Sequence, residues 1–181
     1  MKKIFIINGS GCSEKDTFEQ LVGKYVRTKK YSIVNICKEA AKILGWNGDK
    51  EERDRAFLSD LMDLSTKYND APFDDVIQLV RDFRTNKLKT NVLLIDMRDP
   101  KDIQRAVIKF GAESVLIKNS RAPRIKSNHA DANVNKYEYD YIINNNGTLK
   151  QLDKAARLFT KIAVKNKSTN ERPVYINCKK L

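Results

Sequence analysis

The sequence contains a single histidine, His129, and only three cysteines, Cys12, Cys37 and Cys178. One histidine excludes a metal site built from several histidines. The cysteines are odd in number and lack metal-ligand spacing, which favours reduced thiols in a cytoplasm. No hydrophobic run approaches the roughly 20 residues that span a bilayer. The apolar run 4–7 is too short for the core of a signal peptide. We therefore expect a cytoplasmic protein with no membrane partner.

The composition predicts one globular domain with an excess of positive charge. The chain has 181 residues, of which 41% are hydrophobic and 32% charged, enough to bury a sizeable core. It carries 35 Lys and Arg against 23 Asp and Glu, a formal charge of +12. This charge favours anionic partners, either nucleotides or nucleic acids. No RNA-binding signature accompanies the charge, and lysines scattered over the C-terminal third are typical of a solvated face. A small nucleotide is therefore the favoured partner, and nucleic acid is a weaker alternative.

Apolar runs alternate with helical patterns along most of the chain. Five strands are predicted, over residues 4–7, 31–36, 91–97, 114–118 and 139–143. Helical patterns separate them, over residues 15–27, 38–44, 50–68, 72–83, 100–110 and 148–164. This alternation predicts an α/β fold with a five-stranded, mainly parallel sheet flanked by helices. Residues 174–176 are left as either an edge strand or a disordered segment.

The segment between the first strand and the first helix has the features of a phosphate-binding loop. Its glycines allow backbone N–H groups to curl around an anion, and the following helix N-terminus adds partial positive charge. Lys15 would reach the outer phosphates. Against the pattern G-x-x-x-x-G-K-[ST], Gly9 and Lys15 fit, but Glu14 stands at the second glycine and Asp16 at the Ser/Thr position. The alternative is an ordinary strand–helix turn with a coincidental lysine.

The run G-S-G-C-S-E-K-D-T-F, residues 9–18, resembles the loop of P-loop nucleoside and deoxynucleoside monophosphate kinases, particularly members with G-K-D-T. Residues 54–64, 98–100 and 139–149 also resemble segments of this family. The resemblance implies the three-layer P-loop NTPase fold. It implies a kinase-like domain at 1–165, with an acceptor-binding helical insertion at about 38–86 and a lid at about 119–137, then a basic tail at 166–181. The implied reaction uses ATP and Mg²⁺ to phosphorylate a nucleoside or deoxynucleoside monophosphate.

The resemblance and the chemistry of phosphoryl transfer together suggest roles for individual residues. ATP would be held by Gly9, Gly11, Cys12, Ser13, Glu14, Lys15, Asp16, Thr17 and Asn144. Magnesium would be held by Asp16 and Asp96. Acceptor binding would fall to Arg55, Ser59 and Arg98, and Arg121 and Arg124 would join Lys15 in catalysis. Each position also has a structural alternative: charge pairs on a helix face, a polar strand end, turn-forming asparagines or a solvated basic loop. His129 is expected to be a structural or lid residue.

Glu14 leaves two functional readings open. A side chain there would crowd the bound phosphates, and its carboxylate would repel them by a few kcal/mol at partly screened contact distances. Glu14 could turn outward or pair with a neighbouring cation, which would leave a weakened but working enzyme. Alternatively, the loop is degenerate and the protein is a catalytically impaired nucleotide- or phosphate-binding protein. The sequence defines neither the base and sugar of the acceptor nor an oligomeric state.

Overall fold

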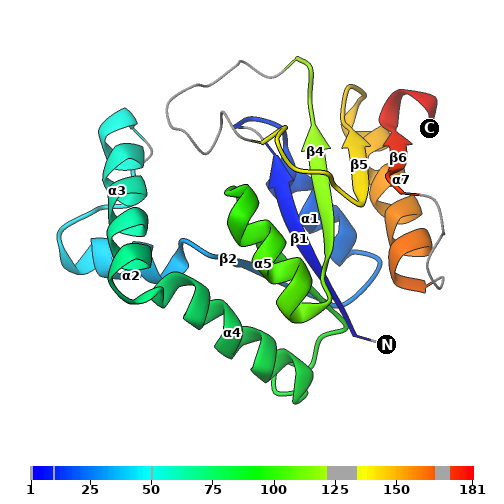
Figure 1. Cartoon of the computed structure of the whole chain (residues 1–181). Helices are drawn as coiled ribbons and strands as arrows, with labels where there is room; N and C mark the ends of the chain where they lie inside the picture. The colour runs from blue at the N-terminus through cyan, green and yellow to red at the C-terminus, as the bar shows by residue number, and fades with distance from the viewer. Residues whose placement is uncertain (1, 10, 50, 122–133, 166–171) are drawn as a thin grey trace.

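The computed structural model describes residues 2–9, 11–49, 51–121, 134–165 and 172–181 (Figure 1). Its centre is a six-stranded sheet in the order β2-β3-β1-β4-β5-β6, and every neighbouring pair is parallel. The strands are β1 (Lys3–Gly9), β2 (Thr28–Ser32), β3 (Val92–Asp96), β4 (Glu113–Lys118), β5 (Tyr141–Asn144) and β6 (Val174–Asn177). The predicted α/β fold with a parallel sheet is confirmed. The predicted number of five strands is corrected to six, because Val174–Asn177 pairs with β5.

Helices connect the strands and cover both faces of the sheet. The α-helices are α1 (Lys15–Gly23), α2 (Asn35–Ile43), α3 (Glu52–Asn69), α4 (Ala71–Arg84), α5 (Pro100–Phe110) and α7 (Leu149–Phe159). A π-helical turn η1 (Thr160–Lys165) extends α7, and a 3-10 turn η2 (Cys178–Lys180) follows β6. The predicted cap of α7 is present, since the Thr148 side chain accepts a hydrogen bond from the N–H of Gln151. None of the helices in the described segments is long and apolar enough to cross a membrane.

The position predicted for the second strand was wrong. The prediction followed the apolar run 31–36, whereas β2 has the polar sequence T-K-K-Y-S and ends at Ser32. Within the described segments this strand lies at the edge of the sheet with β3 as its one neighbour, and its residues are only half-buried or exposed. Ile33 is buried just after the strand, and α2 begins at Asn35. This polar strand carries Lys30.

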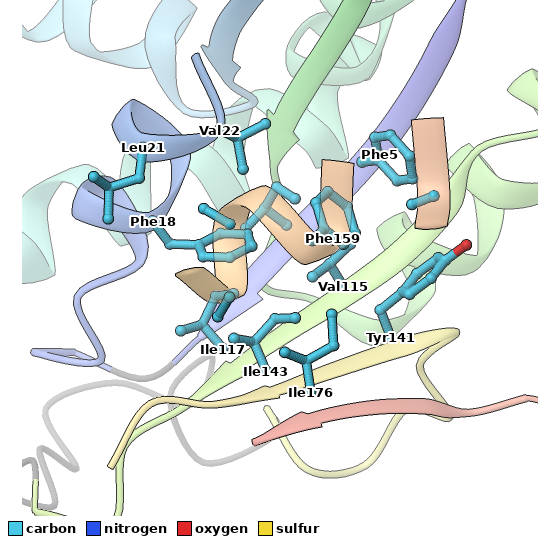
Figure 2. Close-up of a cluster of buried hydrophobic side chains, with 14 of the residues drawn as sticks. Phe5, Phe18, Leu21, Val22, Val115, Ile117, Tyr141, Ile143, Phe159 and Ile176 are labelled. Atoms are coloured by element: carbon cyan, nitrogen blue, oxygen red, sulfur yellow. The ribbon is translucent and has the colours of Figure 1, made fainter. Parts of the chain in front are cut away.

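Alternate residues of β1 belong to two separate cores, as the pleat of a strand requires. Phe5 and Ile7 join the cluster formed with α1 and α7, whereas Ile4 and Ile6 join the cluster formed with α4 and α5. The first cluster is shown in Figure 2. Its aromatic centre is Phe159, whose ring centroid lies 5.0 Å from that of Phe5 in an edge-to-face arrangement. The sheet is therefore the middle of three layers.

The topology defines where a ligand can approach the sheet. β1 lies between β3 and β4 at the centre. α1, which follows β1, packs into the same core as α7, whereas α5, which follows β3, packs into the opposite core. The chain therefore leaves the carboxyl ends of two adjacent strands toward opposite faces. Ligands of open α/β sheets bind in the crevice at such a switch point.

The predicted subdivisions of the chain stay predictions. Helices α2, α3 and α4 lie between β2 and β3 in the sequence, and Figure 1 shows α3 and α4 extending to one side of the sheet. This segment corresponds to the predicted insertion at 38–86. Most of the predicted lid, and residues 166–171 of the predicted tail, lie outside the described residues. Residues 172–181 of that tail contribute β6 and η2.

Candidate functional site

The loop that follows β1 begins at a glycine with no room for a side chain. A Cβ on Gly9 would lie 2.5 Å from Ser13 Oγ and 3.0 Å from the carbonyl oxygen of Ile117 in β4. Gly9 is the last residue of β1 and pairs in register with Ile117, and the loop after it turns back so that Ser13 lies against Gly9. A larger residue at this position would push the loop away from the sheet.

Asn8, a buried residue that the sequence analysis did not name, fixes the base of this loop. Its Oδ1 accepts a hydrogen bond from the N–H of Gly9 at 2.7 Å. Its Nδ2 donates to Tyr139 Oη at 2.7 Å and to the carbonyl oxygen of Arg98 at 3.3 Å. Tyr139 precedes β5 and Arg98 follows β3. Asn8 therefore ties the loop to the segments at the ends of two other strands.

Glu14 adopts the backbone conformation that a glycine would adopt there. Its φ is 62° and its ψ 31°, and it occupies the N-cap position of α1. Cys12 is also left-handed, with a φ of 59°. For a residue with a Cβ, this conformation costs roughly 1–2 kcal/mol. The loop thus has left-handed backbone at the second glycine position of the P-loop pattern, although glutamate stands there.

The Glu14 side chain is exposed, and its carboxylate bonds to Asn145, the residue just after β5. Asn145 Nδ2 donates to Glu14 Oε2 at 2.8 Å and lies 3.4 Å from the carbonyl oxygen of Ser13. Asn145 is buried, and its own N–H donates to Lys118 at the end of β4. Asn144, the predicted residue, is half-buried and pairs in register with Lys118. The structure thus places the neighbour of the predicted asparagine against the loop.

Lys15 and Asp96 meet at the switch point. Lys15 is the first residue of α1 and Asp96 the last of β3, and Lys15 Nζ lies 2.7 Å from Asp96 Oδ2. Asp16, on the first turn of α1, lies 3.8 Å from Lys15 Nζ. The structure therefore brings together three of the residues predicted for the donor and metal site. The first N–H groups of α1 have no partner within the helix, which leaves them able to bind an anion.

Two further charged residues complete this cluster, and the sequence analysis named neither. Glu19 lies one turn after Asp16 on α1, so the two side chains share a face. Lys30 projects from β2 and forms ion pairs with Asp16, with Glu19 Oε2 at 2.5 Å and with Asp96 Oδ2 at 3.8 Å. Exposed fractions are 1% for the Glu19 side chain, 13% for Asp96, 14% for Lys15, 39% for Lys30 and 71% for Asp16.

The protonation of the cluster follows from this burial. Burial, and secondarily the neighbouring Asp96, raise the pKa of Glu19 from 4.5 to about 8, although Lys15 and Lys30 oppose the shift. Burial alone would lower the pKa of Lys30, but its bonds to Asp16 and Glu19 outweigh that effect and raise it. At pH 7 Glu19 is therefore mostly protonated.

The three carboxyl groups could also hold a cation. Asp16, Glu19 and Asp96 each offer an oxygen within 4.8 Å of the other two. Apart from a hydrogen bond shared between the Glu19 and Asp96 carboxyl groups, buried Asp96 Oδ1 and Glu19 Oε1 receive no hydrogen bond from the described residues. Carboxylate oxygens are the ligands that Mg²⁺ prefers, together with water and phosphate oxygens. This donor set fits the predicted magnesium site and adds Glu19 to it.

The other predicted residues come from several segments of the chain. Arg98 is exposed directly after β3, and on α3 Arg55 is exposed and Ser59 half-buried. The Arg121 guanidinium donates to the carbonyl oxygen of Gly147 at 2.6 Å, in the turn before α7. Arg124 and His129 lie outside the described residues. In the loop, Cys12 is exposed, Gly11 and Thr17 are half-buried, and Ser13 is buried.

The fold and the site define a class: a three-layer α/β protein with a glycine loop, a lysine at the start of α1 and a carboxylate on the adjacent strand. The sequence matches no known family model and no curated protein. Among solved structures, the chain is similar to shikimate kinase from Aquifex aeolicus vf5, with a TM-score of 0.46 and 12% sequence identity. The similarity covers 90% of this chain and 99% of that one.

Proposed function

We propose that this protein transfers the γ-phosphoryl group of ATP to a nucleoside or deoxynucleoside monophosphate. The observation that carries the proposal is the pair formed by Lys15 and Asp96, 2.7 Å apart, where the loop after β1 meets the N-terminus of α1. A cation, a helix N-terminus and a carboxylate at the switch point of a parallel sheet suit a metal-bound polyphosphate. The resemblance of residues 9–18 to nucleotide kinase loops supports the same reaction.

The donor would be bound by the loop and the first turn of α1. Backbone N–H groups there would hold the inner phosphates with Thr17, and Lys15 the outer ones. Asp96 keeps the Lys15 ammonium beside the loop, so that the cation is in place before a ligand arrives. Two asparagines hold the loop in place: Asn8 accepts a hydrogen bond from Gly9, and Asn145, just after β5, donates one to Glu14. Because the loop is already ordered, little of its conformation has to change when the phosphates bind.

Magnesium would be held by Asp16 and Asp96. When bound, Mg²⁺ would neutralise charge on the terminal phosphate oxygens of ATP. Of the two carboxylates, Asp96 is positioned by the end of a buried strand, whereas Asp16 is exposed on the first turn of α1. The protein thus offers one fixed and one accessible ligand.

The acceptor would bind through arginines supplied by several segments. Arg98 is attached through its own carbonyl oxygen to Asn8, which places it one strand away from the loop. A guanidinium is suited to the phosphate of a monophosphate, because it can donate two parallel hydrogen bonds. Arg55 and Ser59 would contribute from α3. Arg121 would act on the transferred group with Arg124, which requires that its guanidinium leave the Gly147 carbonyl.

The second candidate is a nucleotide-binding protein with impaired catalysis, and the observation that favours it is Glu14. A carboxylate stands at the second glycine position of the loop and keeps a left-handed backbone there. Its bond to Asn145 holds the negative charge next to the proposed phosphate site. This candidate predicts nucleotide binding without turnover.

A coupled assay of ATP consumption over a panel of ribo- and deoxyribonucleoside monophosphates tests the proposal. We expect turnover with at least one acceptor, and a loss of about 100-fold or more in kcat for Lys15→Met, as for other lost contacts to developing charge. Lys24→Met is the matched control, because Lys24 is an exposed lysine just after α1 and should stay within about twofold of the native protein. ATP binding without turnover on any acceptor would support the impaired candidate. Absence of binding to any nucleoside triphosphate would refute both.

A further inference from the structure

The ammonium of Lys30 lies among the three carboxyl groups that could bind a cation. It contacts Asp16 and Glu19 directly and lies 3.8 Å from Asp96 Oδ2. These three residues are the described acidic side chains whose oxygens lie within 4.8 Å of one another. Lys30 comes from a different element, β2, at the edge of the sheet. The position that suits a metal ion is thus shared with a side chain of the protein itself.

The carboxyl groups are not an ordinary solvated cluster. The Glu19 side chain is 1% exposed, and apart from a hydrogen bond shared with the Asp96 carboxyl group, no described residue donates to its Oε1. Asp96 Oδ1 is also buried, and it too has no other donor among the described residues. Carboxyl groups buried with so few donors are destabilised, because they have lost their water and regained only part of its hydrogen bonds. Lys30 contacts only some of the carboxyl oxygens. The remaining oxygens, Glu19 Oε1 and Asp96 Oδ1, are available to a cation with several coordination positions.

We propose that Lys30 is an internal cation that competes with a divalent metal ion for Asp16, Glu19 and Asp96. In the absence of metal, its ammonium supplies positive charge to Glu19, whereas Lys15 is the nearer cation for Asp96. A divalent ion reaches all three carboxyl groups only when Lys30 withdraws. The proposal deepens the proposed function, on which it rests for the expectation that a metal ion is used here.

The position of Lys30 permits such an exchange. Among the strands that the structure describes, β2 has a neighbour on one side only, and the Lys30 side chain is 39% exposed. A lysine has a flexible four-carbon stem and a strongly hydrated head, so its ammonium can move into water without a change in the backbone. Glu19 cannot move into water in the same way, since its side chain on α1 is almost fully buried. Glu19 and Asp96 therefore form the fixed part of the site, Asp16 is its accessible ligand, and Lys30 is the removable part.

Binding of Mn²⁺ alone, followed by electron paramagnetic resonance without nucleotide, tests the proposal. We expect Lys30→Met to bind Mn²⁺ at least about tenfold more tightly than the native protein, because a competing charge is removed. Lys29→Met is the matched control, since Lys29 is the exposed neighbour on the same strand, and it should leave the affinity unchanged. The double variant Lys30→Met/Glu19→Gln should lose the gain.

Two results would overturn the proposal. One is a folded Lys30→Met protein, judged by circular dichroism, that binds Mn²⁺ no more tightly than the native protein. The other is an equal gain in Lys29→Met, which would reduce the effect to net charge. If Lys30→Met does not fold, Lys30→Gln retains a polar group beside the carboxylates and carries the same expectation. Because no nucleotide is present, a negative result here is distinguishable from failure of the proposed kinase activity.

Discussion

Replacing Glu14 by glycine is the most informative single change, because it alters the backbone and the charge of the loop together. Glu14 has a φ of 62° at the N-cap of α1, and its carboxylate accepts a hydrogen bond from Asn145. Glycine adopts this conformation without a steric penalty. Glu14→Gly therefore relieves strain and also removes a negative charge beside the proposed phosphate site.

The two effects on stability oppose each other. Relief of the left-handed conformation contributes roughly 1–2 kcal/mol. Loss of the bond to Asn145 costs roughly 0.5–1.5 kcal/mol. We therefore expect the free energy of unfolding to change by no more than about 1 kcal/mol.

The effect on ligand affinity is larger and has one sign. Two unit charges about 8 Å apart in an effective dielectric of about 40 interact by about 1 kcal/mol, and a triphosphate carries several such charges. Removing the carboxylate should therefore tighten Mg-ATP binding by about tenfold. Isothermal titration calorimetry measures this directly. Glu14→Gln is the matched control, because it removes the charge but keeps the side chain and the strained backbone, and it should recover most of the gain.

The comparison of variants separates the causes. A gain in Glu14→Gly without a gain in Glu14→Gln would assign the effect to the backbone and not to charge. Equal Mg-ATP affinities in the native protein and both variants would refute the reasoning, since the loop would then not be where the phosphates bind.

Three further predictions concern the same framework. The unfolded chain releases the Glu19 proton near pH 4.5, whereas the folded protein holds it to about pH 8, so the free energy of unfolding should fall as pH rises between these values. Urea titrations at several pH values should show a flatter slope in Glu19→Gln. The exposed control Glu52→Gln should keep the native slope. Phe159→Ala should lower the free energy of unfolding by about 3–5 kcal/mol in the same titrations, because the ring is fully buried at the centre of its core, and a loss below about 1 kcal/mol would contradict that packing. Gly9→Ala should cost about 1–3 kcal/mol and weaken Mg-ATP binding measured by calorimetry, because its new Cβ would meet Ser13 Oγ at 2.5 Å.

Sequence patterns were sufficient for the central strands and for the position of the loop. β1, β3 and β4 are apolar because helices cover both faces of the sheet there, so continuous hydrophobic runs predict them. Once the sheet is parallel, Lys15 and Asp96 are expected at the same edge, and the structure brings them into contact. β2 was misplaced because an edge strand needs no apolar run, and its residues T-K-K-Y-S resemble a surface segment.

The rest of the site depends on contacts that no local pattern records. Glu19, in a helix with acidic and polar neighbours, resembles a solvent-facing residue, yet its side chain is buried against β2 and β3 residues. Lys30 belongs to the basic run 27–30 and has no local feature that distinguishes it from Lys29. The two residues meet only because β2 pairs with β3 in a register that places Lys30 near the end of the sheet. The spacing of Asp16 and Glu19, three residues apart on a helix, was the one available signal.

β6 also determines what the sheet presents to other proteins. A strand with an unpaired edge can recruit a strand from another chain. On this side the outermost described strand has four residues, with Pro173 just before it and Lys179 and Lys180 just after it. Short length, proline and lysine are features that discourage such pairing. Without β6, the open edge of the sheet would be β5, which leads directly to Asn145. The strand that discourages edge pairing therefore also covers the strand before Asn145, the residue that bonds to Glu14 of the loop.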